Sequence, residues 1–217
     1  MKKILLVLGL VFATMTASAQ WYAGGALGFE LDGAWKDKDG NKNGDSFSQF
    51  GILPEVGYAV SDKFDVGIAL EFTLGTHTEW ANDKKTESLK TTMFGVSPYV
   101  RYTFCEFGKF SLLGKAAFNL GFGTGKPSSF DADGKETEGL KSGATVLGFA
   151  ITPVVLYSLS DKICLYTNLN FAGLNFESVT TKYDGDKTGS QSYFGIGANT
   201  DNAFTLGAIQ VGFVFTF

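Results

Sequence analysis

The last eight residues of the chain, Gln210 to Phe217, constrain the fold more than any other stretch. Phe213, Phe215 and Phe217 alternate there with smaller or polar residues, and alternate residues of a strand lie on one face. Water would leave this row of aromatic rings uncovered, whereas lipid would cover it. The pattern therefore indicates a strand whose apolar face meets a membrane.

The first 19 residues have the form of a secretory signal peptide. Two lysines precede an apolar stretch at residues 4–13, and the small residues Ala17-Ser18-Ala19 come before Gln20. Ten apolar residues are too few for a membrane-spanning helix, which needs roughly 20. We therefore expect residues 1–19 to be removed and residues 20–217 to form one β-barrel domain.

The expected mature chain is acidic and contains no apolar run long enough for a helical span. Without the two leader lysines it has 16 basic and 22 acidic residues, which gives a net charge of −6. This balance argues against nucleic acid as a partner, because nucleic-acid binding needs a basic surface. Only helices and closed β-barrels satisfy the backbone in lipid, so a membrane-spanning form of this chain must be a barrel.

A diverged hairpin pattern recurs three times. Each copy begins with Pro, reaches Tyr four residues later, makes a short turn and leaves as a second alternating strand, at residues 54–72, 98–118 and 153–171. Longer polar segments separate the hairpins, and we expect them to be outer loops: 33–46, 76–90, 124–142 and 177–203.

This organisation predicts an all-β fold, an eight-stranded antiparallel up-and-down transmembrane β-barrel. Spanning strands need about 9–11 residues. An even number of strands places both termini at the short-turn end. The expected strands cover residues 21–32, 47–60, 65–75, 91–104, 110–123, 143–157, 163–176 and 204–217.

Every mid-strand charge falls on the face opposite the aromatic row. That face holds Glu55, Glu71, Arg101 and Lys115, which we expect at similar depth on neighbouring strands. A lysine or arginine facing lipid at mid-membrane costs about 2–4 kcal/mol, so an apolar exterior and a charged interior are favoured. A soluble sandwich or lipocalin, with the faces reversed, is the alternative.

These four charges can neutralise one another inside the barrel, as buried charges require. Arg101 is the only arginine of the chain, and we expect it to pair with Glu55 or Glu71. Because eight strands enclose just enough room for side chains, a salt-bridge plug is favoured over a gate for small ions.

With these features, the chain resembles the small eight-stranded outer-membrane barrels of the OmpA/OmpX type, the outer membrane β-barrel domain or porin family. Its last strand matches the family's polar-x-Gly-x-x-aromatic-x-aromatic signal through Gln210, Gly212, Phe215 and Phe217. The resemblance implies recognition by the barrel assembly machinery and a location in the outer membrane of a Gram-negative bacterium.

Loop one contains half of a calcium-binding pattern. From Asp39 it matches through Asn41, Asn43 and Gly44, but Phe50 occupies the twelfth position, where a bidentate glutamate belongs. We expect a flexible polar loop and neither a metal nor a cofactor.

His77 is the only histidine, so any histidine-dependent nucleophile must use it. No serine stands at the spacing that outer-membrane lipases and lipid A deacylases use. We expect a loop histidine in a protein that is not an enzyme, and a lipid-modifying enzyme is the weakest alternative.

Cys105 and Cys164 would reach an oxidising compartment, which favours a disulfide. Three strand spacings of about 4.8 Å separate them, however, and this exceeds the reach of about 7 Å between Cα atoms. We expect two free thiols.

Taken together, these patterns predict a monomeric barrel that anchors the protein in the membrane. Its loops would contact surface ligands, and the apolar outer face of its strands would contact outer-membrane lipid and lipopolysaccharide. A narrow porin or channel for small solutes is the alternative.

Overall fold

A computed structural model describes residues 20–170, 172–183, 186–198 and 209–217, and these residues fold as antiparallel β-strands joined by turns. The expected signal peptide, residues 1–19, lies outside the described residues. Over the described ranges no residue is helical, and so none belongs to a helix that could cross a membrane.

The described residues form twelve strands in chain order. Their bounds are β1 (Gln20–Asp32), β2 (Trp35–Lys36), β3 (Lys42–Ser61), β4 (Phe64–Ala81), β5 (Lys84–Phe107), β6 (Phe110–Phe130), β7 (Glu136–Glu138), β8 (Ser142–Ser158), β9 (Ile163–Leu169), β10 (Ala172–Tyr183), β11 (Asp186–Ala198) and β12 (Ile209–Thr216).

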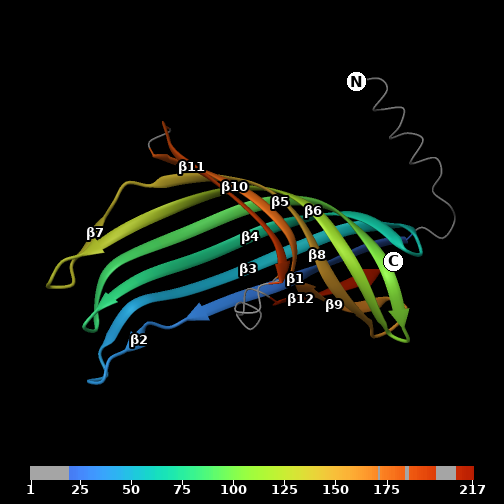
Figure 1. Cartoon of the computed structure of the whole chain (residues 1–217), viewed down its shortest axis with the longest axis horizontal. Coiled ribbons are helices and arrows are strands. Elements are labelled where there is room, and N and C mark those ends of the chain that lie inside the picture. Colours follow the sequence, from blue (N-terminus) through green and yellow to red (C-terminus); the bar gives the residue numbers. More distant parts are fainter. Residues whose placement is uncertain (1–19, 171, 184–185, 199–208) are drawn as a thin grey trace.

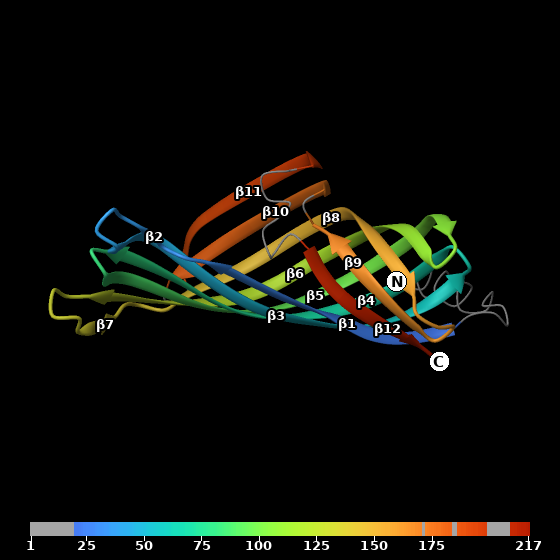
Figure 2. The same ribbon diagram turned by 90° about the horizontal axis from the view of Figure 1, so that it is seen from below.

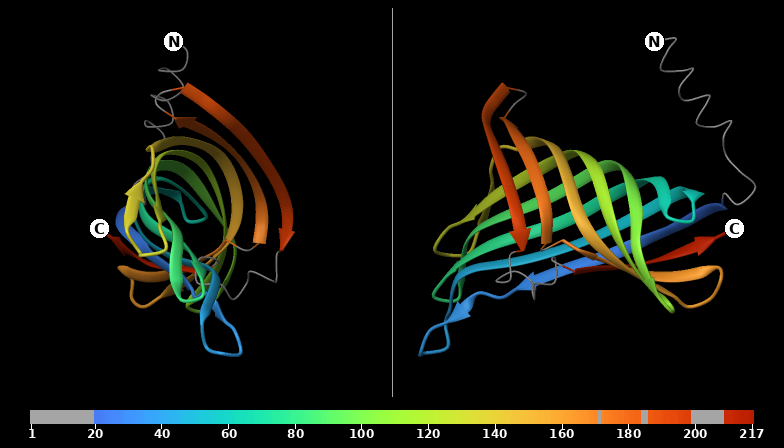
Figure 3. Two further views of the ribbon diagram at one scale, coloured as in Figure 1. Left: turned by 90° about the vertical axis from the view of Figure 1, so that its left-hand side faces the viewer. Right: turned by 45° about the vertical axis from the view of Figure 1, so that its right-hand side comes forward.

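Eight of these strands close a ring at the end where the described chain begins and ends (Figures 1 and 3). From β1 the ring runs through β3, β4, β5, β6 and β8 to β9, and β9 pairs with β12. Pairing of β12 with β1 closes it, with Tyr22 opposite Thr216. The predicted antiparallel barrel is therefore confirmed, with a ring of eight strands within a sheet of twelve described strands and both ends of the described chain at the short-turn end.

The two faces of the barrel strands alternate as predicted. On the outer face Phe72, Phe94 and Phe213 are 39%, 47% and 57% exposed, whereas Ala69 and Arg101 on the inner face are 4% and 3% exposed. A soluble sandwich or lipocalin would bury the aromatic face. The exterior is instead the apolar surface of a barrel that is surrounded by lipid.

The seventh barrel strand is interrupted, which the sequence pattern did not predict. The expected strand 163–176 is divided into β9 and β10, and Gly173 just beyond the division has a φ of 126°, which favours glycine. Beyond this point β8 pairs with β10, and β10 with β11 (Figure 3). The first residues of the expected strand 204–217 lie outside the described residues, and its described part is β12.

The prediction of four long outer loops was wrong in extent. Most of residues 33–46, 76–90, 124–142 and the described part of 177–203 is strand, because β3 to β6 continue well past the barrel ring. β5 alone has 24 residues, about twice what a span needs. The outer parts of β3 to β6, with β2 and β7 beside them, form what we call the projecting sheet, which lies away from the C-terminus in Figure 2.

The second expected loop is a two-residue turn. Asn82 and Asp83 connect β4 to β5, and their φ angles of 50° and 63° are those of a type I′ hairpin turn. Asn82→Val should speed amide hydrogen exchange around Trp80 and Lys85, because a β-branched residue is strained at positive φ, while Asn82→Gly should not. Exchange rates measured by NMR check this, and equal rates in the two variants would contradict it.

Candidate functional site

The interior of the ring is filled at its turn end by an apolar core. Inward side chains from five strands pack together there, and Val154 is completely buried. The buried members are Tyr22, Ala26, Leu113, Val154, Tyr166 and Val214. An eight-stranded barrel has room for little else, so this part of the lumen is a packed core.

Three interior tyrosines lie flat over glycines of the neighbouring strand. Tyr22 is opposite Gly57, Tyr99 opposite Gly67 and Tyr166 opposite Gly212 in the strand pairing. A Cβ atom at Gly67 would lie 2.5 Å from the Tyr99 ring, and one at Gly212 would lie 2.5 Å from the Tyr166 ring. These glycines therefore provide the space into which the rings pack, a cross-strand pairing of glycine with an aromatic.

An ion-pair network centred on Arg101 lies beside this core. Arg101 Nε donates to Asp65 Oδ1 at 2.9 Å, and Nη1 donates to Glu55 Oε1 at 3.4 Å. Arg101 and Glu55 are 3% and 5% exposed. Ion pairs buried this deeply are stable only when further hydrogen bonds satisfy their atoms, and Tyr22 supplies one to Asp65.

The hydroxyl of Tyr22 donates to Asp65 Oδ1 at 2.8 Å and lies 3.0 Å from the hydroxyl of Tyr99. The guanidinium of Arg101 lies 4.9 Å from the ring centre of Tyr22 and 5.1 Å from that of Tyr99. Lys115 is opposite Arg101 on β6, and its Nζ lies 4.4 Å from the Tyr99 ring centre. Cations over ring faces are attracted to the aromatic quadrupole, so Tyr99 binds both cations and Tyr22 binds Arg101.

The structure brings together three of the four predicted lumen charges, Glu55, Arg101 and Lys115. Arg101 pairs with Glu55 and Asp65, and Glu71 lies apart, accepting a hydrogen bond from Thr73 Oγ1 at 3.2 Å. The expectation that all four share one depth was therefore wrong for Glu71. The charges still balance, because Asp65 takes the place of Glu71 beside Glu55, Arg101 and Lys115.

Sequence reasoning missed Asp65 and Tyr22 as members of the network. Asp65 alternates with the inward-facing residues of β4. It lies next to the first turn, however, and only charges in the middle of a strand were predicted to belong to the lumen. The strand register carries the missing signal, because Asp65 lies directly opposite Arg101.

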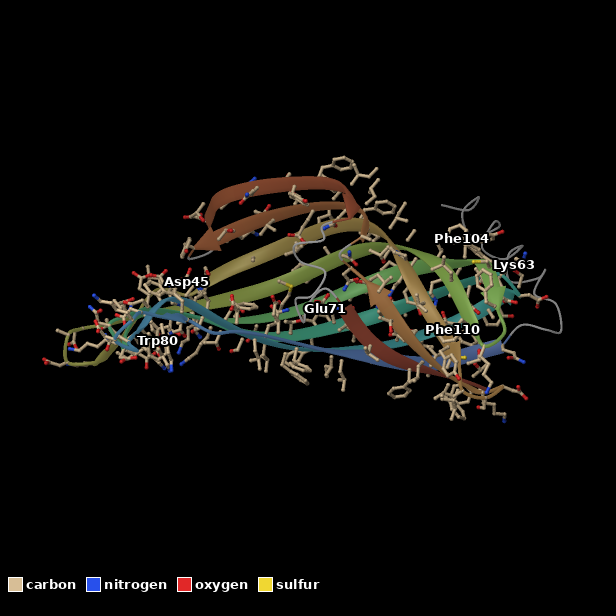
Figure 4. The ribbon with its side chains drawn as sticks, turned by 60° about the horizontal axis from the view of Figure 1, so that its bottom comes forward. Asp45, Lys63, Glu71, Trp80, Phe104 and Phe110 are labelled. Carbon is tan, nitrogen blue, oxygen red and sulfur yellow. The ribbon has the colours of Figure 1, made fainter. Side chains whose placement is uncertain are left out.

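A cavity of about 580 Å³ occupies the outer half of the barrel interior. It is lined by Glu71, His77, Glu79 and Glu87 together with apolar residues such as Met93. Figure 4 places Glu71 between the turn end, marked by Lys63, Phe104 and Phe110, and the projecting sheet, marked by Asp45 and Trp80. The network residues Glu55, Asp65 and Arg101 do not line this cavity.

His77 lies on β4, and its Nε2 atom is 3.7 Å from Asp45 Oδ1. In the part of the chain that the structure describes, it makes no hydrogen bond to a serine or threonine. Over the same residues, no group of three or more His, Cys, Asp or Glu side chains is placed to hold a metal ion.

The half-pattern for calcium in loop one folds around Asp37. The Asp37 carboxylate accepts hydrogen bonds from the Asn41 side chain and from the backbone N–H groups of Asn41 and Asp39. These bonds, with that from the Asn41 side chain foremost, hold the pKa of Asp37 below its usual value. The bonded form of the loop is therefore favoured above the usual pKa and loses this support as the pH falls through the lowered one.

Cys105 and Cys164 are free and half-buried, so the prediction of two free thiols is confirmed. The Sγ atom of Cys164 lies 3.7 Å from Ser158 Oγ.

The predicted assembly signal, Gln210, Gly212, Phe215 and Phe217, lies on β12 and at its end. Gly212 also makes space for Tyr166, so packing alone requires glycine there. Phe215 and Phe217 are exposed on the outer face, with ring centres 5.3 Å apart. Recognition by the assembly machinery stays a prediction.

Comparisons with known proteins give matches in structure alone. No family model matches the chain, and no curated protein matches it in sequence. The translocator domain of the autotransporter NalP from Neisseria meningitidis is 11% identical with a TM-score of 0.48, and the match covers 89% of this chain and 64% of that domain.

A major outer membrane protein from Thermus thermophilus is also 11% identical with a TM-score of 0.47, over 92% of this chain and 100% of that protein. Neisserial surface protein A is 13% identical with a TM-score of 0.38, over 92% and 99% of the two chains. The class of the fold, a closed antiparallel β-barrel with an apolar exterior, follows from the strand pairing and side-chain exposure of this chain itself.

Proposed function

We propose that this chain is an integral outer-membrane protein whose barrel anchors it and whose lumen does not conduct. The observation that carries the proposal is the filled interior, in which the Arg101 network and the apolar core occupy the ring together. The protein is not an enzyme in this proposal, and it acts as a monomer.

Its location is supported by the exposed apolar belt around a closed ring. All aromatic rings of the row Phe72, Phe94 and Phe122 face outward, while the buried charges face inward. A chain of this kind can bury its belt only in lipid. The signal peptide expected from the sequence would direct its export from the cytoplasm.

The projecting sheet supports the second part of the proposal, contact with partners at the cell surface. It extends polar strands beyond the ring, with β2 and β7 at its two edges. Both edge strands are very short and carry charge, which discourages further strand addition. Partners should therefore contact the faces and turns of this sheet rather than its edges, at the positions first expected to be loops.

Planar-bilayer recording of the refolded mature protein tests the proposal. We expect no steady conductance, because the ring is filled. Steady conductance that changes on Glu71→Lys, but not on the control Glu138→Lys outside the lumen, would overturn the anchor and favour a pore.

A narrow channel is the second candidate, and the cavity beside Glu71 is the observation that favours it. Its carboxylates would favour cations in the outer half of the lumen. The lipid-modifying enzyme would require His77, so an unchanged lipid A profile in cells that express His77→Ala in place of the native chain is the result expected here.

A further inference from the structure

Charges sort by sign between the two faces of β3 to β6 beyond the aromatic row. Asp45, Glu79 and Glu87 are cross-strand neighbours on the inward face. On the opposite, outward face lie Lys42, Lys85, Lys90 and Lys126. Lys84, which is next to the β4–β5 turn and opposite Ala81, is the exception. This outward face continues the surface that meets lipid lower in the barrel.

The strand register places two lysines directly above the aromatic belt. Phe94 and Phe122 are cross-strand partners, and four residues further out Lys90 and Lys126 are partners as well. At about 3.3 Å per residue, the lysines lie about 13 Å along the strands from the aromatic row. On strands tilted by about 45°, this is a rise of about 9 Å along the membrane normal, toward the headgroup layer above the hydrocarbon core.

Each lysine has a carboxylate from β7 beside it. Lys126 Nζ lies 2.8 Å from Glu138 Oε1, and Lys90 Nζ lies 3.9 Å from Glu136 Oε1. The hydrogen bond from Lys126 and its charge, with smaller contributions from Lys90 and Lys141, hold the pKa of Glu138 below its usual value. Three lysines surround two glutamates, so the cluster keeps an excess positive charge.

The side chains remain accessible to a ligand despite these pairs. Those of Lys90 and Lys126 are 62% and 40% exposed. Exposed ion pairs contribute little, so an anion can share the lysines with the glutamates. Like charges directly opposite on neighbouring strands repel each other, and an anion between them relieves this repulsion.

We propose that Lys90 and Lys126 bind the phosphate group of a lipid headgroup in the leaflet that surrounds the barrel. The inference rests on the membrane location in the proposed function and names the lipid chemistry that the outer surface recognises. Farther out, Trp80 stands between Lys42 at 4.8 Å and Lys85 at 5.5 Å, which extends the cationic surface along the same face.

Native mass spectrometry of the mature chain tests the proposal. The protein is inserted into phosphatidylcholine nanodiscs that contain either bisphosphorylated lipid A or the same lipid without phosphates, and retained lipid is counted. Lys90→Gln/Lys126→Gln should lower retention of the phosphorylated lipid at least about fivefold, since each lysine near an anionic surface contributes to binding. Lys90→Arg/Lys126→Arg should retain it.

The matched control is Lys109→Gln/Lys162→Gln, which removes two exposed lysines at the turn end. The control should retain the phosphorylated lipid as the native chain does. The proposal would be overturned if Lys90→Gln/Lys126→Gln and the control retained the phosphorylated lipid equally. It would also be overturned if the native chain retained the phosphate-free lipid as well as the phosphorylated one. Failure of the native chain to insert would instead contradict the proposed membrane anchor.

Discussion

Arg101→Ala is expected to lower the free energy of unfolding of the barrel by about 3–5 kcal/mol, because Glu55 and Asp65 would stay buried without their cation. The substitution also removes the cation between the rings of Tyr22 and Tyr99. Urea unfolding in lipid vesicles, followed by circular dichroism, measures the change.

The control is the quadruple variant Arg101→Met/Lys115→Met/Glu55→Gln/Asp65→Asn, which removes all four charges of the network together. It should recover much of the lost stability, because no buried charge is left unpaired. An unfolding free energy for Arg101→Ala equal to that of the native barrel, with conductance also unchanged, would refute a structural role of the network.

Gly67→Ala should destabilise the barrel by about 2 kcal/mol or more, because the added Cβ would lie 2.5 Å from the Tyr99 ring in a packed interior. Tyr99 would have to move, and its contacts with Tyr22 and Arg101 would be lost with it. The same urea unfolding experiment measures the effect.

Gly28→Ala is the matched control, since its Cβ would meet nothing closer than a Gln210 side-chain atom at 3.8 Å. In a chain that already carries Tyr99→Ala, Gly67→Ala should lower the free energy of unfolding by less than it does in the native chain, because the ring that the added Cβ would meet is gone. If Gly67→Ala and Gly28→Ala unfold alike, the tyrosine is not packed against Gly67 as described.

Alternation was sufficient to predict the ring, its two faces and the short turns. In lipid, only one face of a strand is apolar, so the pattern of Phe213, Phe215 and Phe217 repeats on every spanning strand. It also placed Glu55, Arg101 and Lys115 inside, because an outward charge in the membrane is costly.

Beyond the membrane this signal disappears, because both faces of the projecting sheet meet polar surroundings. The segment 76–90 has the composition of a loop, yet it is a β-hairpin with a two-residue turn. Only the positive φ angles of Asn82 and Asp83 distinguish it, and composition does not reveal them.

Contacts inside the lumen depended on register, which alternation does not supply. Asp65 rather than Glu71 pairs with Arg101, because Asp65 is its cross-strand partner. The tyrosine–glycine contacts have the same origin. A glycine has no side chain, and its neighbours in the sequence do not indicate its role. That role becomes visible only when the register shows which tyrosine lies opposite.

The central claim is that the outer face meets lipid while the inner face is packed. Methyl NMR of the native chain in nanodiscs tests it on three successive residues of β4, Ile68, Ala69 and Leu70. Ile68 and Leu70, 40% and 42% exposed, should show nuclear Overhauser effects to lipid acyl chains, and Ala69, 4% exposed, should show none. Acyl-chain contacts at Ala69, or their absence at Ile68 and Leu70, would contradict the account.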